Sequence, residues 1–214
     1  MPHYKLTYFN LRARAEPIRL LFHLANKELE EVRVPLFDSV IVDVKKTLPF
    51  GQLPVLEVNG VQIPQTTAII RYLAREFGLE PADPVENALC DALIEQVNGE
   101  FITAILPWHL VNIGIVKEGD KNALYEQYLP VRKQHFEQFT KFLKTNKTGS
   151  GYAVGAKLTY ADLVLANQLQ WLQRLDPAGE KMLDGFPELK EHRDKVLKDE
   201  RLKEYMDRRP DEWY

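Results

Sequence analysis

The pattern of apolar residues changes at residues 78–84, and this change constrains the fold more than any other feature of the chain. The segment holds one glycine and two prolines in seven residues, which is typical of a linker. Before it, strand-like and helix-like patterns alternate, whereas the long stretches after it have helical periodicity. The sequence therefore predicts a small α/β domain at 1–77 and a larger all-helical domain at 85–214.

The order of elements in the first domain indicates its fold class. Tyr4–Phe9 is rich in aromatic and β-branched residues and predicts a strand, and a helix with Pro17 in its first turn follows it. Glu31–Val34 predicts a second strand, and Asn59–Gly60 predicts a hairpin because both residues tolerate positive φ. A helix over Thr67–Phe77 completes the order expected of a thioredoxin-like domain.

The second domain is expected to consist of long helices only, at roughly 85–115, 121–145, 160–175 and 188–206. Thr159 and Asp162 precede an apolar run with the spacing of a capping box, in which each side chain accepts from the other residue's backbone N–H. This pattern is a folding device, so we do not expect Asp162 to be catalytic.

Bulk composition excludes several function classes. The net charge of the 214 residues is −3 and no basic block is present, so we expect neither nucleic acid nor an anionic membrane as a partner. No apolar run approaches the ~18 residues of a membrane-spanning helix. The single cysteine, Cys90, excludes an internal disulfide, and the first residues lack the apolar core of a secretory signal. We expect a cytoplasmic protein.

The end of the first strand carries the first candidate for chemistry. A thioredoxin-like domain usually suggests a Cys-x-x-Cys pair there, but this chain has Tyr8-Phe9-Asn10-Leu11, so any sulfur must arrive with a ligand. A phenol hydroxyl that donates to a sulfur favours the thiolate, and Arg14 is a nearby cation. The alternative is that Tyr8 is half-buried packing.

Two further segments are suited to an extended peptide with a carboxylate. Pro54 stands at the entry of a strand, where a cis bond would turn the chain and leave the backbone of Leu53 free to pair with a ligand. Gln65 and Thr66 open a helix, whose first-turn amides suit a carboxylate. The alternatives are an edge proline that stops sheet growth and simple N-capping by Thr66.

The motifs at 8–12, 49–60 and 65–75 resemble the glutathione-site motifs of the cytosolic glutathione transferases. Together with Leu-Thr-x-Ala-Asp-Leu at 158–163, they are most similar to the sigma class, and within it to the nematode members. The resemblance spans the whole chain. It implies the glutathione transferase fold, glutathione as a co-substrate, no metal, and a homodimer.

The resemblance also implies site residues. Tyr8 activates the thiol and Arg14 supports the thiolate, while Lys45 holds the glycyl carboxylate and Gln65 and Thr66 hold the γ-glutamyl carboxylate. Leu53 pairs its backbone with the cysteinyl residue. The implied glutathione-binding set is Tyr8, Arg14, Ile41, Lys45, Gly51, Gln52, Leu53, Pro54, Gln65, Thr66 and Glu95, the last from the partner subunit.

The chain departs from the family pattern at three places. Thr66 replaces a common serine and keeps the hydroxyl. The loop at Phe37–Ile41 has two extra residues and lacks a tryptophan that usually donates to the glycyl end, and Ile41 cannot donate from its side chain. Ala13 stands where a glycine is frequent, which narrows the approach to Arg14.

An apolar wall for the second substrate is expected by family position. Its candidates are Phe9, Ala13, Val97, Phe101, Ile105, Val164 and Gln168. Residues at such helical spacing are otherwise core. Trp108 suits either a pocket or a plug between helices, and we interpret His109 as structural.

These observations favour a glutathione transferase that conjugates the thiolate to hydrophobic electrophiles in detoxification, with peroxidase activity as a side reaction. One alternative is a glutathione-dependent isomerase that converts prostaglandin H2 to prostaglandin D2. Another is a non-catalytic binder of haem or other hydrophobic ligands, and a third is an interaction module without redox residues.

Overall fold

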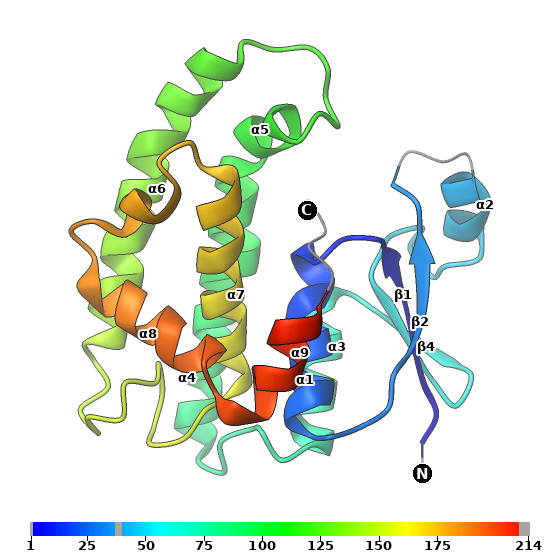
Figure 1. Ribbon diagram of the computed structural model, residues 1–214. Coiled ribbons are helices and arrows are strands. Elements are labelled where there is room, and N and C mark those ends of the chain that lie inside the picture. The colour runs from blue at the N-terminus through cyan, green and yellow to red at the C-terminus, as the bar shows by residue number, and fades with distance from the viewer. Residues whose placement is uncertain (1, 37–39, 210–214) are drawn as a thin grey trace. The chain divides into compact units, whose positions relative to one another are not determined.

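The structure is a computed structural model that describes residues 2–36 and 40–209 (Figure 1). Its chain divides into two compact units. The first takes in the residues up to Glu80 together with those from Asp199 onward, and the second spans Pro81–Lys198.

The first unit is built on a four-stranded sheet with the strand order β2-β1-β3-β4. β1 (Tyr4–Phe9) pairs in parallel with β2 (Glu30–Val34) and antiparallel with β3 (Val55–Val58). β3 pairs antiparallel with β4 (Val61–Pro64). The predicted thioredoxin-like architecture is confirmed by this mixed sheet.

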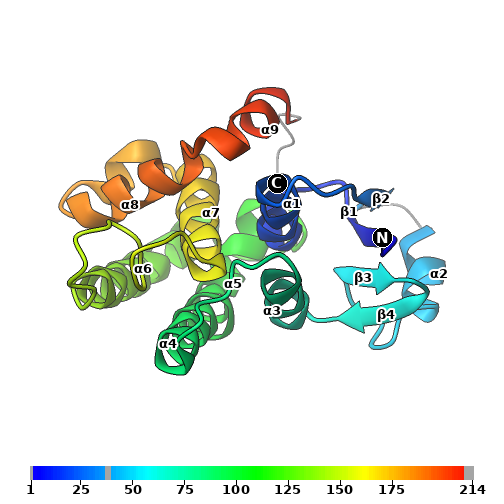
Figure 2. The ribbon, with the colours of Figure 1, turned by 90° about the horizontal axis from the view of Figure 1, so that it is seen from below.

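Helices cover both sides of the sheet. α1 (Glu16–Leu24) and α3 (Thr66–Glu76) lie on one face, and α2 (Val40–Lys46) lies on the other side (Figure 2). Pro17 falls in the first turn of α1, where its missing N–H costs nothing. The two helices on the shared face contribute fully buried side chains to the core: Ile18, Leu21, Phe22, Ile69, Ile70 and Leu73.

The hairpin between β3 and β4 turns at the predicted dipeptide. Asn59 has φ 48° and Gly60 has φ 86°, the positive values that a two-residue hairpin turn requires. The turn fixes the register of β3, and β3 leads back along the chain to the segment Gly51–Pro54.

The second unit is helical, as predicted. α7 is its buried centre, since residues 160–169 are all buried, and it packs against α8 and α4. The helical elements of this unit are α4 (Pro84–Glu95), η2 (Gln96–Phe101), α5 (Ile102–Asn112), α6 (Lys121–Leu143), α7 (Tyr160–Leu175), η3 (Gly179–Leu183) and α8 (Pro187–Leu197). The helix expected over 85–115 is thus three segments, with a π-helical one in the middle.

The chain after α8 differs from the expectation that everything beyond residue 84 belongs to the helical domain. η4 (Glu200–Leu202) and α9 (Lys203–Arg208) group with the first unit. There the ring of Tyr205 stacks on His23 with centroids 4.0 Å apart, and Leu202 is fully buried. Periodicity predicts that a segment is helical, but it does not say against which core the helix packs.

The capping box of α7 is confirmed. Asp162 accepts from the Thr159 backbone N–H at 2.7 Å and from its hydroxyl at 2.9 Å. Its other oxygen accepts from the Ala153 N–H at 2.6 Å, and the carboxylate is fully buried. Asp162 therefore joins the start of α7 to the preceding loop.

Within residues 2–36 and 40–209, no helix has the length and the apolar character needed to cross a membrane.

Candidate functional site

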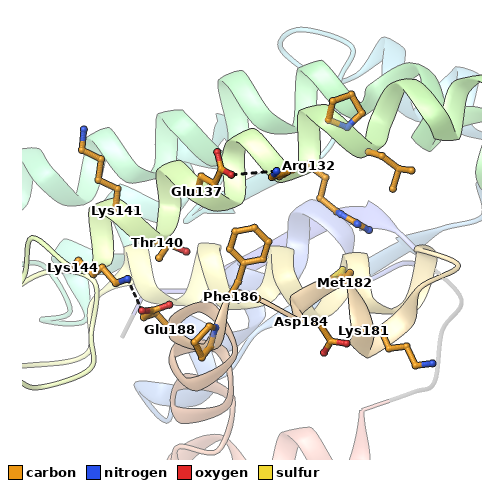
Figure 3. Close-up of a pocket in the computed structure, with 15 residues that line it drawn as sticks. Arg132, Glu137, Thr140, Lys141, Lys144, Lys181, Met182, Asp184, Phe186 and Glu188 are labelled. Carbon is orange, nitrogen blue, oxygen red and sulfur yellow. Dashed lines mark ion pairs between the residues drawn. The ribbon is translucent and has the colours of Figure 1, made fainter.

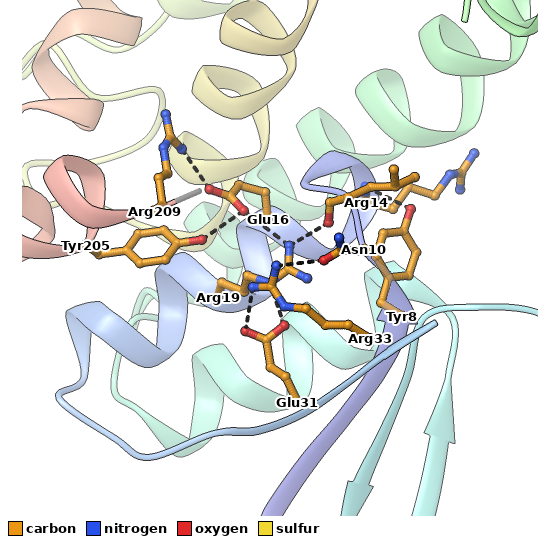
Figure 4. Close-up of polar contacts among 10 residues, drawn as sticks. Tyr8, Asn10, Arg14, Glu16, Arg19, Glu31, Arg33, Tyr205 and Arg209 are labelled. Atoms are coloured by element: carbon orange, nitrogen blue, oxygen red, sulfur yellow. Dashed lines mark hydrogen bonds and ion pairs between the residues drawn. The ribbon is translucent and has the colours of Figure 1, made fainter. Parts of the chain in front are cut away.

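Tyr8 lies at the end of β1 and is only 5% exposed. Its hydroxyl oxygen accepts a hydrogen bond from the backbone N–H of Arg14 at 3.3 Å (Figure 4). Burial raises the pKa of the Tyr8 hydroxyl, while the N–H and the positive charge of Arg14 act in the opposite direction. The phenol is therefore protonated at neutral pH, and its O–H remains a donor for a ligand atom.

The turn between β1 and α1 brings Arg14 to Tyr8. It contains the short 3₁₀ segment η1 (Ala13–Ala15), and Ala13 has φ 35°. This is the left-handed region that a Cβ disfavours. The side chain of Arg14 is exposed, so its contact with the tyrosine is made by the main chain.

The segment before β3 has the backbone that the sequence predicted. The Leu53–Pro54 bond is cis, and Gly51 has φ 61°. A Cβ at Gly51 would lie 3.6 Å from the Lys45 carbonyl oxygen, which is ordinary contact, so the positive φ is what favours glycine. Among the described residues, the N–H and C=O of Leu53 make no hydrogen bond to another backbone group. They are available to pair with an extended peptide.

Gln65 rather than Thr66 caps α3. Gln65 occupies the N-cap position with φ 74°, and its side chain makes no capping hydrogen bond. Instead its Nε2 donates to Gln52 Oε1 at 3.2 Å, which joins the start of α3 to the segment before β3. Thr66 is the first helical residue and is 8% exposed, so the alternative of simple N-capping by Thr66 is wrong. The first-turn amides of α3 remain suited to an anion.

The two residues expected at the glycyl end lie on α2. Ile41 is half-buried and Lys45 is exposed. The Lys45 carbonyl accepts from the Leu48 N–H at 3.2 Å, so the end of α2 leads directly into the turn before Gly51. Most of the altered loop, residues 37–39, lies outside the described residues.

Glu95 is the last residue of α4 in the second unit, and its side chain is exposed. A Cβ at Gly99 would lie 3.0 Å from Glu95 Oε2, so the glycine leaves room for this carboxylate. The partner-subunit role of Glu95 stays a prediction.

The residues expected to form an apolar wall are mostly buried. Phe9 is half-buried, and the others are at most 8% exposed: Ala13, Val97, Phe101, Ile105, Val164 and Gln168. Phe101 packs among Phe136, Phe139 and His135, with ring centroids 5.0–6.1 Å apart. For Phe101 this packing favours the core alternative over a pocket role.

Trp108 is buried between two helices, which matches the second of its two predicted roles, a plug between helices. It is 2% exposed and stacks on Tyr128, with centroids 3.9 Å apart and ring planes 13° apart. The neighbouring His109 lies 5.4 Å from the ring of Trp171. Cys90 is also buried, and desolvation raises the pKa of its thiol to about 12. A thiol with that pKa is not a nucleophile at neutral pH.

A surface groove of about 1110 Å³ runs between α6 and the segment that leads into α8 (Figure 3). None of the predicted site residues lines it. Three of its cations already have acidic partners: Lys144 lies 2.6 Å from Glu188, Lys133 lies 3.9 Å from Glu137, and Arg132 pairs with Asp176. These three cations are therefore already paired with carboxylates of the protein.

Family models match both parts of the chain. Residues 4–75 match the glutathione S-transferase N-terminal domain, and residues 114–209 match the glutathione S-transferase C-terminal domain. The chain belongs to the glutathione S-transferase family. It is therefore a glutathione transferase by both fold and enzyme class.

Relatives of similar length support this assignment. The transferase is 38% identical to "Probable glutathione S-transferase 8" of Caenorhabditis elegans, over 99% of this chain and 98% of that one. A monomeric glutathione S-transferase of the hookworm Necator americanus has a TM-score of 0.89 and 41% identity, covering 99% and 100% of the two chains. A Nu-class enzyme from Haemonchus contortus has a TM-score of 0.86 and 42% identity, with full coverage of both.

A more distant structure also aligns along nearly the whole transferase. The prostaglandin synthase D of Nilaparvata lugens has a TM-score of 0.83 and 31% identity, covering 97% of this chain and 98% of that one. The relatives from Caenorhabditis elegans, Necator americanus and Haemonchus contortus show that the transferase has nematode homologues.

Proposed function

We propose that Tyr8 activates glutathione by donating its O–H to the sulfur and so stabilising the thiolate. The observation that carries this proposal is the hydrogen bond from the Arg14 N–H to the Tyr8 oxygen, which leaves the phenol proton free to point at a ligand. A free thiol has a pKa near ~8.5, so only a few per cent is ionised at pH 7. Lowering that pKa by ~2 units needs about 2.7 kcal/mol of differential stabilisation.

One charge-assisted hydrogen bond supplies about 1.5–3 kcal/mol. Tyr8 alone therefore accounts for most of the activation, and the exposed guanidinium of Arg14 adds a favourable positive charge. In conjugation the thiolate attacks an apolar electrophile, and the leaving group departs with the electron pair of the bond that breaks.

The rest of the tripeptide is held by the segments on either side of β3 and β4. Leu53, next to Gly51, Gln52 and the cis Pro54, pairs its backbone with the cysteinyl residue. Gln65 and Thr66 bind the γ-glutamyl carboxylate at the start of α3, where the amides and the helix dipole favour an anion. Lys45 binds the glycyl carboxylate, and Ile41 lies on the same helix.

We also propose a cytoplasmic homodimer in which Glu95 of the partner subunit contacts the γ-glutamyl amine. Large apolar side chains with high exposure occur in both units: Phe50 is 65% and Val61 67% exposed in the first, and Val85 is 68% exposed in the second. Because the hookworm relative is described as monomeric, the oligomeric state is tested by sedimentation, in which we expect a dimer. A monomer that retains full activity would contradict the role of Glu95.

For the substrate, we propose conjugation of hydrophobic electrophiles by a sigma-type enzyme. A second candidate is isomerisation of a prostaglandin endoperoxide, which is favoured by the similarity to a prostaglandin synthase D. Storage of haem or other hydrophobic ligands is the third, and its mark would be tight ligand binding without turnover.

The test is conjugation of glutathione to a chlorodinitrobenzene-type electrophile by the parent and by Tyr8→Phe. The variant keeps the ring and loses the donor, so we expect turnover at neutral pH to fall at least ~10-fold, about 1.4 kcal/mol of barrier. Binding to immobilised glutathione should persist. Equal turnover in the two proteins would refute the role of Tyr8, and binding without turnover in the parent would favour the isomerase or the storage protein.

A further inference from the structure

A buried carboxylate, Glu16, lies at the start of α1 beside the turn that carries Arg14 (Figure 4). Glu16 is 0% exposed, and a buried charge of this kind requires partners. Its two oxygens accept from Arg209 Nη1 at 2.7 Å and from Tyr205 Oη at 3.0 Å. Both partners belong to the segment after residue 198 that groups with the first unit.

Arg19 connects this carboxylate with the turn itself. Its Nη1 lies 3.4 Å from Glu16 Oε2 and donates to the carbonyl of Leu11 at 2.7 Å. Its Nε donates to Glu31 Oε2 at 2.9 Å, and the guanidinium is only 2% exposed. The turn at residues 12–15 is therefore flanked by two residues, Leu11 and Glu16, that both contact the buried guanidinium of Arg19.

The turn between them needs such support. Ala13 has φ 35°, and a non-glycine residue persists in this region only where the surrounding contacts determine its conformation. The hydrogen bond from the Arg14 N–H to Tyr8 Oη is 3.3 Å long, beyond the usual range for N–H···O. A small displacement of the turn is enough to lose it.

We infer that Arg209 and Tyr205 are positioning residues for Tyr8: by pairing with Glu16 they hold the turn in the geometry in which the Arg14 N–H reaches the Tyr8 hydroxyl. The inference rests on the proposed role of Tyr8. A hydroxyl that accepts a hydrogen bond is polarised and donates more strongly in turn. Losing that bond weakens the donation to the thiolate, so less of the bound glutathione is ionised.

The test uses Arg209→Met and Tyr205→Phe in the full chain. Thiolate absorbance of bound glutathione, titrated with pH, is expected to show a thiol pKa raised by about half a unit in each variant. Conjugation at about pH 6.5, close to the lowered thiol pKa, then falls roughly twofold. It converges on the parent rate once the pH exceeds both pKa values. A structural loss would lower the rate by the same factor at every pH and leave the thiol pKa unchanged.

Arg208→Met is the matched control. Arg208 is the residue before Arg209, and it pairs with Glu204 at 2.7 Å while both side chains are more than three-quarters exposed. We expect it to leave the thiol pKa and the pH profile unchanged. Arg209→Lys, which keeps the charge, is expected to recover part of the shift. If Arg209→Met does not fold, Tyr205→Phe still tests the inference, because it removes a single hydroxyl.

Tyr8→Phe, alone and combined with Arg209→Met, separates the two proposals. If Tyr8→Phe leaves the thiol pKa unchanged, the proposed role of Tyr8 fails and the positioning role falls with it. If Tyr8→Phe raises the pKa while Arg209→Met and Tyr205→Phe leave it at the parent value, only the positioning role is overturned. We expect Arg209→Met to add no further shift in the Tyr8→Phe background, because the two changes act through one hydroxyl.

Discussion

Replacing Asp162 by alanine tests how much of the stability depends on one buried cap. The carboxylate accepts from the N–H groups of Ala153 and Thr159 at 2.6 and 2.7 Å, in a site with no exposure. Alanine leaves both donors buried without these acceptors, at about 1–3 kcal/mol each. The expected loss is therefore about 2–6 kcal/mol, a large share of the ~5–15 kcal/mol that stabilises a typical protein.

Asp120→Ala provides the comparison, because Asp120 also caps a helix by accepting from two backbone N–H groups, at 3.0 and 3.1 Å. That cap is exposed, so water replaces the carboxylate and we expect a loss of only about 0.5–2 kcal/mol. The assay is urea unfolding of both variants and the parent, followed by circular dichroism. A loss in Asp162→Ala no larger than that in Asp120→Ala would refute the reasoning from buried, unpaired donors.

Three further predictions concern single residues of the first unit and the buried thiol. Because burial raises the pKa of the Tyr8 hydroxyl above the ordinary tyrosine value of ~10, ionisation of this residue should not lower the conjugation rate below that pH; a decline centred well below pH 10 would contradict this. Ala13→Gly should relieve about 1–2 kcal/mol of backbone strain in the folded state. The greater freedom of glycine in the unfolded chain lowers the stability by only ~0.4–1 kcal/mol. Thermal unfolding should then show a midpoint equal to or above that of the parent, and a drop of several degrees would count against strain at Ala13. Cys90, whose pKa is raised to about 12, should resist iodoacetamide at neutral pH until the protein unfolds, as intact mass would report.

Features that depend on neighbouring residues were predictable from the sequence. Tyr4–Phe9 forms the expected strand, Asn59–Gly60 forms the expected hairpin turn, and the bond before Pro54 is cis. The capping box is another local pattern, in which two residues three positions apart, Thr159 and Asp162, determine the geometry. In each case the required backbone conformation is encoded by the residues that adopt it.

Features that depend on distant contacts were not predictable. Gln65 takes φ 74° and bonds to Gln52, and nothing in its neighbourhood signals a positive φ for a glutamine. Arg14 was expected to act through its charge, whereas its main-chain N–H is what contacts Tyr8. Two of the partners of Glu16, Tyr205 and Arg209, are 189 and 193 positions away, beyond the range of any periodicity. The expected glutathione contacts come from the family resemblance and stay predictions.

The return of the chain to the first unit has a consequence for biosynthesis. Residues up to Glu80 leave the ribosome first, but Tyr205 and Arg209 follow only after the whole of the second unit, Pro81–Lys198. During that interval Glu16 has Arg19 but neither of its later partners. A nascent chain, or an isolated fragment ending at residue 80, therefore carries a buried acid that lacks two of its hydrogen-bond partners, and the first unit is completed only after the second unit has been made.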